Sequence, residues 1–279
     1  LIFLSVWLLI VYVPVTHWVW GGGILSSWGT MDFAGGIVVH ATAGTAALVT
    51  ALTLGKRRGF PKSITPPYST ILTMIGASML WIGWFGFNAG SALGANGGAG
   101  MAMLVTHISA VTASLVWMFI ELRRFGKPSL IGIVTGMVAG LATVTPASGY
   151  IGVPGGLVLG FFGGLFCYLA VDYIRGKLQI DDSLDVFAVH GVGGILGTLL
   201  VAFLATSTFS GLGLAEGQTA VSQFFVQLKA VVLTVAWTSV FTYLILKITS
   251  FIVPLRVDKQ EEIKGLDLRS HGEKGYHSD

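Results

Sequence analysis

The stretch that decides the fold is residues 32–54, DFAGGIVVHATAGTAALVTALTL. It is long enough to cross a bilayer as a helix and almost wholly apolar, yet it carries one imidazole, His40, near its middle. Gly36, His40 and Gly44 are spaced four residues apart, so they share one face of that helix. Because a face of small residues lets another backbone come close, we predict that His40 points into a packed bundle and not toward lipid.

A second stretch, residues 185–205, repeats this pattern as DVFAVHGVGGILGTLLVAFLA, with His190, Gly194 and Thr198 on one face. The strings around the two histidines read VVHATAG and AVHGVGG. A single intramembrane histidine can be a structural hydrogen-bond donor between helices. An ionisable group inside a span is costly, however, and two of them in matching contexts favour a functional site.

The composition is that of an all-α, polytopic membrane protein. The chain has 279 residues, of which 10% are charged, and its mean hydropathy is +0.80. The net charge of +3 comes mainly from short loops, so it indicates topology and not a nucleic-acid partner. The single cysteine, Cys167, excludes an internal disulfide. Since the chain opens inside an apolar run and without Met, we expect an N-terminal part to be missing.

Apolar segments near the ~20 residues of a spanning helix follow one another along the chain. There are eight: residues 1–15, 32–54, 69–90, 99–120, 130–146, 153–174, 184–206 and 221–250. Because backbone polar groups cannot stay unpaired in hydrocarbon, these segments predict helices and not strands.

Basic residues alternate between loops and predict the orientation. They lie in the loops around 56–62, 123–127 and 175–177 and in the tail, whereas the loops 16–31, 91–98, 147–152 and 207–220 have none. The positive-inside rule places the basic loops, the chain start and the C-terminus in the cytoplasm. The two histidine spans are then antiparallel, as in an inverted repeat, whose site lies near the midplane. His40 and His190 each lie ~12–13 Å from opposite ends, so their rings are expected to meet.

The predicted outer mouth is rich in aromatic side chains. Trp20 stands beside a glycine run, and the third segment ends in GWFGFNAGSA, which holds Phe87 and Ser91. Aromatic faces attract small cations, and a hydroxyl accepts a hydrogen bond from an ammonium group. Tryptophans at membrane interfaces are commonly anchors, the reading we prefer for Trp18 and Trp28. The spacing of Phe87 alone is equally compatible with core packing.

Two further interpretations concern the acidic residues and metals. Asp32 and Asp185 stand at span starts, where we expect helix N-caps. Each histidine span offers one histidine and no third strong ligand within a turn, which argues against a metal site and a membrane metalloprotease. A receptor or sensor built on the same body remains an alternative.

At these residues the chain resembles the Amt branch of the ammonium transporter (Amt/Mep/Rh) superfamily. The resemblance covers essentially the whole chain and is carried by DFAGGIVVHATAG, GWFGFNAGSA, DVFAVHGVGGILG and the tail GLDLRSHGEKGY. It implies an inverted-repeat fold of eleven spans, of which spans four to eleven are present. Residues 1–250 would form the transport domain in the cell membrane, and residues 251–279 a cytoplasmic regulatory tail.

The resemblance also implies roles and partners. His40 and His190 would be the twin pore histidines, Trp20 and Ser91 the ammonium-recruitment site, and Phe87 one of two gate phenylalanines. The regulatory motif of the tail would be Gly265, Asp267, His271, Gly272, Glu273 and Tyr276, with Gly275 where Ala is usual. The expected function is transport of ammonium or ammonia by a homotrimer in lipid, without enzymatic activity, cofactor or metal. A PII-type signalling protein is an expected partner at the cytoplasmic face.

Overall fold

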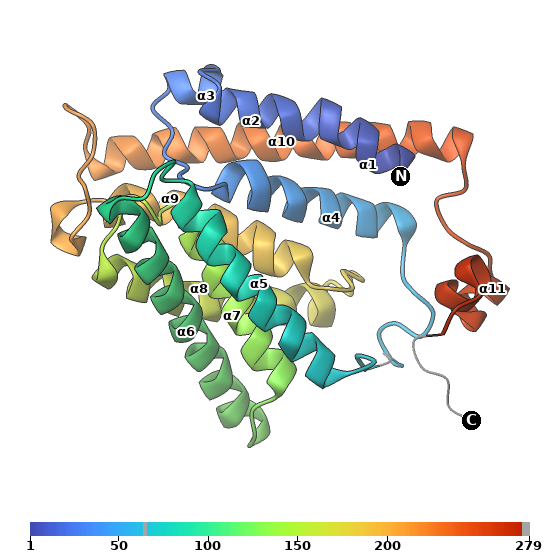
Figure 1. Ribbon diagram of the computed structural model, residues 1–279. Helices are drawn as coiled ribbons and strands as arrows, with labels where there is room; N and C mark the ends of the chain where they lie inside the picture. The colour runs from blue at the N-terminus through green and yellow to red at the C-terminus, as the bar shows by residue number, and fades with distance from the viewer. Residues whose placement is uncertain (64–65, 275–279) are drawn as a thin grey trace.

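The computed structural model describes residues 1–63 and 66–274, and every regular element within them is a helix (Figure 1). In chain order these are α1 (Ile2–Trp7), η1 (Leu8–Tyr12), α2 (Val13–Trp20), α3 (Ile24–Ser27), η2 (Gly36–Ala41), α4 (Thr42–Leu54), α5 (Thr70–Gly90), α6 (Gly97–Phe125), α7 (Leu130–Val144), α8 (Val153–Val171), η3 (Asp172–Lys177), η4 (Phe187–Gly191), α9 (Val192–Leu204), η5 (Ser207–Phe209), α10 (Ala220–Ile252), α11 (Lys259–Lys264) and η6 (Asp267–His271).

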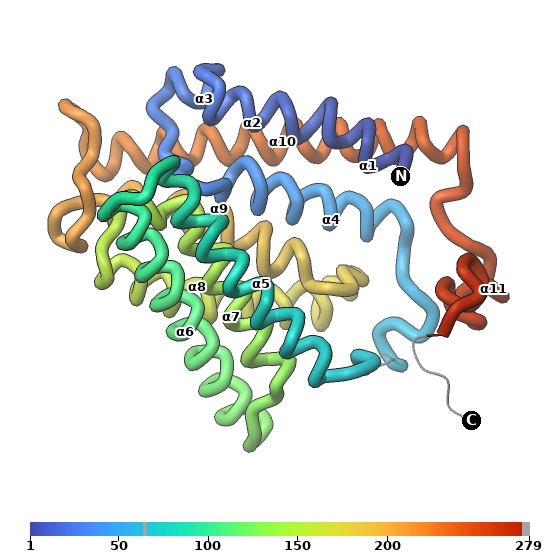
Figure 2. Tube along the Cα trace, viewed as in Figure 1, coloured from blue at the N-terminus to red at the C-terminus, as the bar shows by residue number. Residues whose placement is uncertain are grey.

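The helices pack as one bundle around the two histidine spans. The long α10 lies between the α1–α3 segment and α4 (Figure 1), and α9 contacts both η2 and α10. On the other side α5, α6, α7 and α8 pack against one another. The trace in Figure 2 places the chain start, the end of α4 and the short α11 at the same end of the bundle. This is the end that the basic loops predict to be cytoplasmic.

The prediction of an all-helical, polytopic membrane protein is confirmed. Seven helical stretches of the described chain are long and apolar enough to cross a membrane. The eighth predicted segment, 130–146, forms the 15-residue α7, which at ~22 Å is shorter than the hydrocarbon core. That segment's crossing therefore stays a prediction. The first helix also differs, because it continues to Trp20 through the predicted end at residue 15.

The two histidine spans are antiparallel and in close contact, as predicted. Residues along one span meet residues in reverse order along the other: Gly36 faces Thr198, His40 faces Gly194, and Gly44 faces Gly191. A Cβ on Gly194 would lie 2.5 Å from the Cβ of His40, and one on Gly44 would collide with the backbone of Gly191. Glycine is therefore required at these crossings, because any larger residue would push the spans apart.

Both histidines lie in π-helical turns, which the periodicity of the sequence did not predict. His40 belongs to η2 and His190 to η4, and each turn continues into a regular α-helix, α4 or α9. The backbone N–H of His40 donates to the carbonyl of Gly35, five residues back, at 2.9 Å. Such single π turns within helices occur frequently at functional sites.

Candidate functional site: a buried histidine pair

The rings of His40 and His190 meet inside the bundle. Their Nδ1 atoms lie 3.2 Å apart, and the ring centroids are 5.2 Å apart. His40 is only 3% exposed. A hydrogen bond at this distance requires one Nδ1 to carry the proton and the other to accept it, so the two tautomers must differ.

An aromatic wall flanks the pair. Trp84 stacks on both rings, with centroids 5.3 Å from His40 and 6.3 Å from His190, and Phe87 lies 6.2 Å from His40. The Trp84 indole N–H donates to Thr145 Oγ1 at 3.0 Å, which holds the ring in place. Phe87 thus lies beside the histidine pair, and its role as a gate residue stays a prediction. Trp84 was not predicted as a site residue, although it stands three residues before Phe87 in the same aromatic motif.

A cavity of about 570 Å³ opens beside the two rings. Apart from the histidines its lining is apolar: Val39, Ala43, Met79, Leu80, Gly83, Trp84, Phe87 and Val186. The Nε2 atom of His40 is buried and has no hydrogen-bond partner among the described residues. A buried nitrogen without a partner is costly and is commonly kept for a ligand or a proton. The cavity therefore offers a polar edge in an otherwise apolar space.

Asp32 holds the start of the His40 span, as its predicted N-cap role requires. Its carboxylate accepts the backbone N–H groups of the residues that open η2, Gly35, Gly36, Ile37 and Val38, at 2.9, 2.6, 2.8 and 3.2 Å. Its backbone carbonyl accepts the Trp20 indole N–H at 2.8 Å. One buried residue thus positions both the histidine span and a candidate recruitment residue.

Asp185 was expected to cap the helix that holds His190, but Asp182 does so instead. The first N–H of η4, that of Phe187, donates at 2.7 Å to the carboxylate of Asp182, five residues earlier. Asp185 itself has a positive φ of 53° and pairs with Arg175 at 3.1 Å. The chain bends through Asp185, and the Asp185 carboxylate pairs with Arg175 and not with the N–H groups at the start of η4. Asp182 accepts the first of these N–H groups in its place.

The two candidate recruitment residues lie on separate elements. Trp20 ends α2 and is 46% exposed, with its indole N–H already engaged. Ser91 caps α5, and its hydroxyl donates to the carbonyl of Phe87 at 2.9 Å. No hydrogen bond or ring contact joins these two residues in the described chain, so their shared site stays a prediction.

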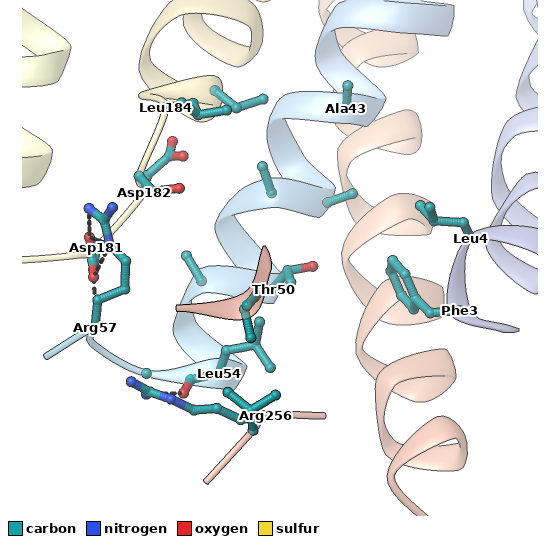
Figure 3. A pocket seen from close by; sticks show the side chains of 18 of the residues that line it. Phe3, Leu4, Ala43, Thr50, Leu54, Arg57, Asp181, Asp182, Leu184 and Arg256 are labelled. Carbon is teal, nitrogen blue, oxygen red and sulfur yellow. Dashed lines mark hydrogen bonds and ion pairs between the residues drawn. The ribbon is translucent and has the colours of Figure 1, made fainter. Parts of the chain in front are cut away.

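A second cavity, of about 670 Å³, lies toward the chain start and the tail (Figure 3). Ala43 and Val186 line both this cavity and the one beside the histidines. Its other walls come from α1, α4, the loop before η4 and the start of the tail. The histidine pair is therefore adjacent to an opening at the end predicted to be cytoplasmic.

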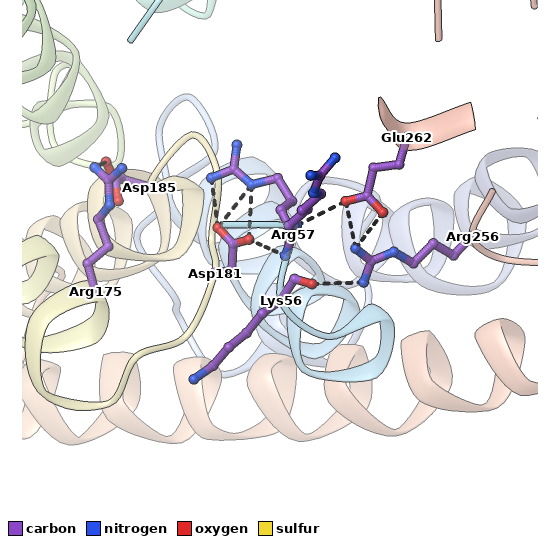
Figure 4. Close-up of polar contacts among 8 residues, drawn as sticks. Lys56, Arg57, Arg175, Asp181, Asp185, Arg256 and Glu262 are labelled. Carbon is purple, nitrogen blue, oxygen red and sulfur yellow. Dashed lines mark hydrogen bonds and ion pairs between the residues drawn. The ribbon is translucent and has the colours of Figure 1, made fainter. Parts of the chain in front are cut away.

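Ion pairs join the segments around this opening (Figure 4). Arg57 pairs with Asp181 at 2.7 Å and also donates its backbone N–H, which ties the end of the His40 span to the approach of the His190 span. Burial alone would raise the pKa of Asp181, but the guanidinium and backbone N–H of Arg57 outweigh it and hold the pKa below its ordinary value. The resulting stabilisation is complete above the ordinary carboxyl pKa and is lost as the pH falls through the lowered one.

The tail is docked on the same opening. Glu262 on α11 accepts both Arg256 Nη2, at 2.8 Å, and the backbone N–H of Arg58, at 3.0 Å. Of the predicted regulatory residues, Gly265 and Gly272 have positive φ angles. Asp267 is the first residue of η6 and His271 is the last, and Glu273 follows two residues later. Tyr276 lies outside the described residues. Their regulatory role stays a prediction.

Comparison with known proteins identifies the family. A polytopic helical bundle that buries a polar pair beside an apolar cavity is the architecture of a membrane transporter. Residues 1–276 match the family model described as Ammonium Transporter Family. The chain is 48% identical to the ammonium transporter Amt1 of Archaeoglobus fulgidus over 98% of its own length and 69% of the relative. It therefore belongs to the ammonium transporter family, whose named members are transporters and not enzymes.

Solved structures agree with this assignment. The structure of Candida albicans Mep2 is 36% identical, with a TM-score of 0.84, over 97% of this chain and 62% of that one. A protein described as a sensor Amt protein is 30% identical, with a TM-score of 0.86, over 94% of this chain and 67% of that one. The chain spans about two thirds of the length of the curated relatives that it matches.

Proposed function

We propose that this protein carries ammonium across the cell membrane by conducting ammonia past the histidine pair. The observation that carries the proposal is the 3.2 Å contact between the His40 and His190 rings at the edge of an apolar cavity. Ammonia both donates and accepts hydrogen bonds, so it can exchange partners with an imidazole nitrogen. A bare cation would lose its hydration in this space without compensation.

The residues around the pair suggest an order of events. Trp20 and Ser91 recruit the ammonium ion on the outer side, Trp20 through its ring face because its N–H is engaged. The ion releases its proton near Phe87, ammonia passes along the two imidazoles, and the inner cavity leads it out between Ala43 and Val186. The hydrogen-bonded rings also offer a path along which the proton can follow.

Assembly, orientation and partners are part of the same proposal. Residues 1–250 form the transport domain, and residues 251–279 form a regulatory tail on the cytoplasmic side, where the basic loops lie. The family resemblance supports a homotrimer with one pore in each subunit. It also supports a PII-type signalling protein that closes the inner opening, where Arg57 and Arg256 are already arranged around the cavity.

The proposal is tested by uptake of labelled methylammonium into cells or vesicles that hold the protein, with membrane current recorded at the same time. We expect saturable uptake that ammonium competes away. Uptake with current indicates that the proton follows, and uptake without current indicates passage of ammonia alone. No uptake by protein that is present in the membrane would contradict transport.

A sensor that uses the same body is the alternative function. It is favoured only by the similarity to the protein described as a sensor Amt protein. Three curated relatives that are 44–48% identical are named as transporters or putative transporters, which supports transport as the main role. Ammonium binding without uptake would instead favour sensing over transport as the main role.

Replacing the outer residues should weaken recruitment more than passage. For Trp20→Leu and Ser91→Ala we expect a twofold to about thirtyfold rise in the half-saturating methylammonium concentration, because each removes one cation contact. Maximal uptake should change less. Trp20→Phe is the matched control, since it keeps an aromatic face and loses only the hydrogen bond to Asp32. An unchanged concentration dependence in both variants would rule the site out.

Removing the tail end should impair transport without removing the protein from the membrane. Deletion of residues 265–279 leaves the contact of Glu262 with Arg256 in place but removes η6, so it isolates the distal segment. We expect reduced uptake per molecule, because the tail is proposed to couple the subunits beneath the pore. Uptake and abundance are measured together, and full activity of the deletion would eliminate the coupling role.

A further inference from the structure

Gln227, on α10, is wholly buried, and its side-chain amide is fully hydrogen-bonded. Its Nε2 donates to the carbonyl oxygens of Met31, at 2.7 Å, and Thr198, at 2.9 Å. Its Oε1 accepts the backbone N–H of Met31 at 2.8 Å and Nε2 of Gln223 at 3.2 Å. A primary amide has two donor hydrogens and two acceptor lone pairs, so all of its bonding capacity is used.

The backbone partners of this amide belong to the two histidine spans. Met31 directly precedes Asp32, whose carboxylate holds the first turn before His40. Thr198 lies eight residues beyond His190 on the same continuous helix, ~12 Å along its axis. Gln227 therefore joins the outer ends of both spans through a single planar group.

Gln223, one turn earlier on α10, fixes the orientation of this amide. Its Nε2 donates to Gln227 Oε1 and also to the carbonyl of Gly29 at 3.0 Å, and the side chain is 3% exposed. With Oε1 of Gln227 directed at two donors, its Nε2 has to face the two carbonyls. The buried pair thus holds the 29–31 loop against α10 in one register.

We infer that Gln227 is a positioning residue for the histidine pair, a role that rests on the proposed function. The inner ends of the spans are already joined by Arg57 and Asp181. Between the ends the contact consists of the histidine hydrogen bond itself and of glycines and apolar atoms, and these last attract without direction and allow sliding. Hydrogen bonds from Gln227 set the separation and the register of the outer ends of the two spans. These two quantities in turn set the distance between the Nδ1 atoms of His40 and His190.

Two substitutions test this role. Gln227→Leu removes all four hydrogen bonds, and Gln227→Glu keeps the shape but places oxygen against the two carbonyls. The matched control is Gln218→Leu, since Gln218 is an exposed glutamine just before the same helix. We expect uptake of methylammonium per molecule to fall about tenfold to a hundredfold in both Gln227 variants, because a misplacement of ~1 Å can cost up to about a hundredfold in rate. The control should match the wild type.

A role in folding alone gives a different result. It would lower membrane abundance and the thermal midpoint, while surviving molecules keep wild-type uptake and wild-type exclusion of potassium. That outcome in both Gln227 variants would overturn the inference.

The structure of a Gln227 variant separates this inference from the proposed function, because it needs no transport. We expect the Nδ1 atoms of His40 and His190 to move beyond hydrogen-bond reach, more than ~3.5 Å apart. An unchanged separation would overturn the positioning role, even if the wild-type protein transports ammonium. Absence of wild-type uptake would instead overturn the proposed function, whatever the separation in the variant.

Discussion

His40→Ala and His190→Ala are expected to remove selective ammonium conduction while leaving the protein folded. The glycines at positions 36, 44, 191 and 194 carry the close packing of the two spans, so loss of an imidazole leaves the backbone contact in place. The apolar cavity would then lack its polar edge, and ammonia would lose its hydrogen-bonding partner inside it. We expect the largest loss of flux of any substitutions described here.

His40→Asp separates two explanations of that loss. A carboxylate in place of the imidazole would attract an intact cation, so potassium is expected to enter. The measurement is uptake of methylammonium and potassium by the three variants, each corrected for membrane abundance. Wild-type flux and selectivity in all three would refute the mechanism and leave the histidines as interhelical struts.

Asp32→Ala is expected to cause the second largest effect, through the structure that positions the site. The buried carboxylate accepts four backbone N–H groups at the start of η2. An ordinary N-cap contributes ~1 kcal/mol, whereas hydrogen bonds to a charged group contribute ~1.5–3 kcal/mol each, though not additively. We expect a destabilisation above ~3 kcal/mol together with loss of uptake.

The matched control for Asp32 is Asn96→Ala. Asn96 caps α6 through one exposed hydrogen bond, to the N–H of Ala99 at 3.0 Å, and should cost ~1 kcal/mol or less. Thermal unfolding in detergent and membrane abundance are compared for both variants. An equal loss of stability in Asp32→Ala and Asn96→Ala would show that the four hydrogen bonds of Asp32 stabilise the protein no more than one ordinary cap does.

Much of the arrangement could be predicted from the sequence because membranes restrict the possible structures. Long apolar runs must form helices, alternating basic loops indicate orientation, and the repeat of glycine around His40 and His190 indicates an antiparallel contact. The structure confirms that contact, because the rings of His40 and His190 lie within hydrogen-bonding distance. These features follow from burial and from spacing along the chain, which sequence patterns record.

Other features depend on local backbone geometry that residue types do not specify. Asp182 caps η4 in place of Asp185 because the chain turns through a positive φ at Asp185, a position that commonly favours glycine. Trp84 could have been found, since it stands one turn from Phe87, but an interfacial anchor explains such a tryptophan equally well. The bonds of Gln227 reach backbone atoms up to 196 residues away, which no spacing rule indicates.

The π turns at the two histidines change how these spans are to be drawn on a helical wheel. A π turn closes one residue later than an α turn, and each residue of an α-helix advances the wheel by about 100°. Each π turn opens its span, so the residues of α4 and α9 are shifted in phase by one residue relative to the turn that holds His40 or His190. A one-residue deletion inside either turn would restore regular phase and rotate the imidazole away from its partner, which makes that extra residue part of the site.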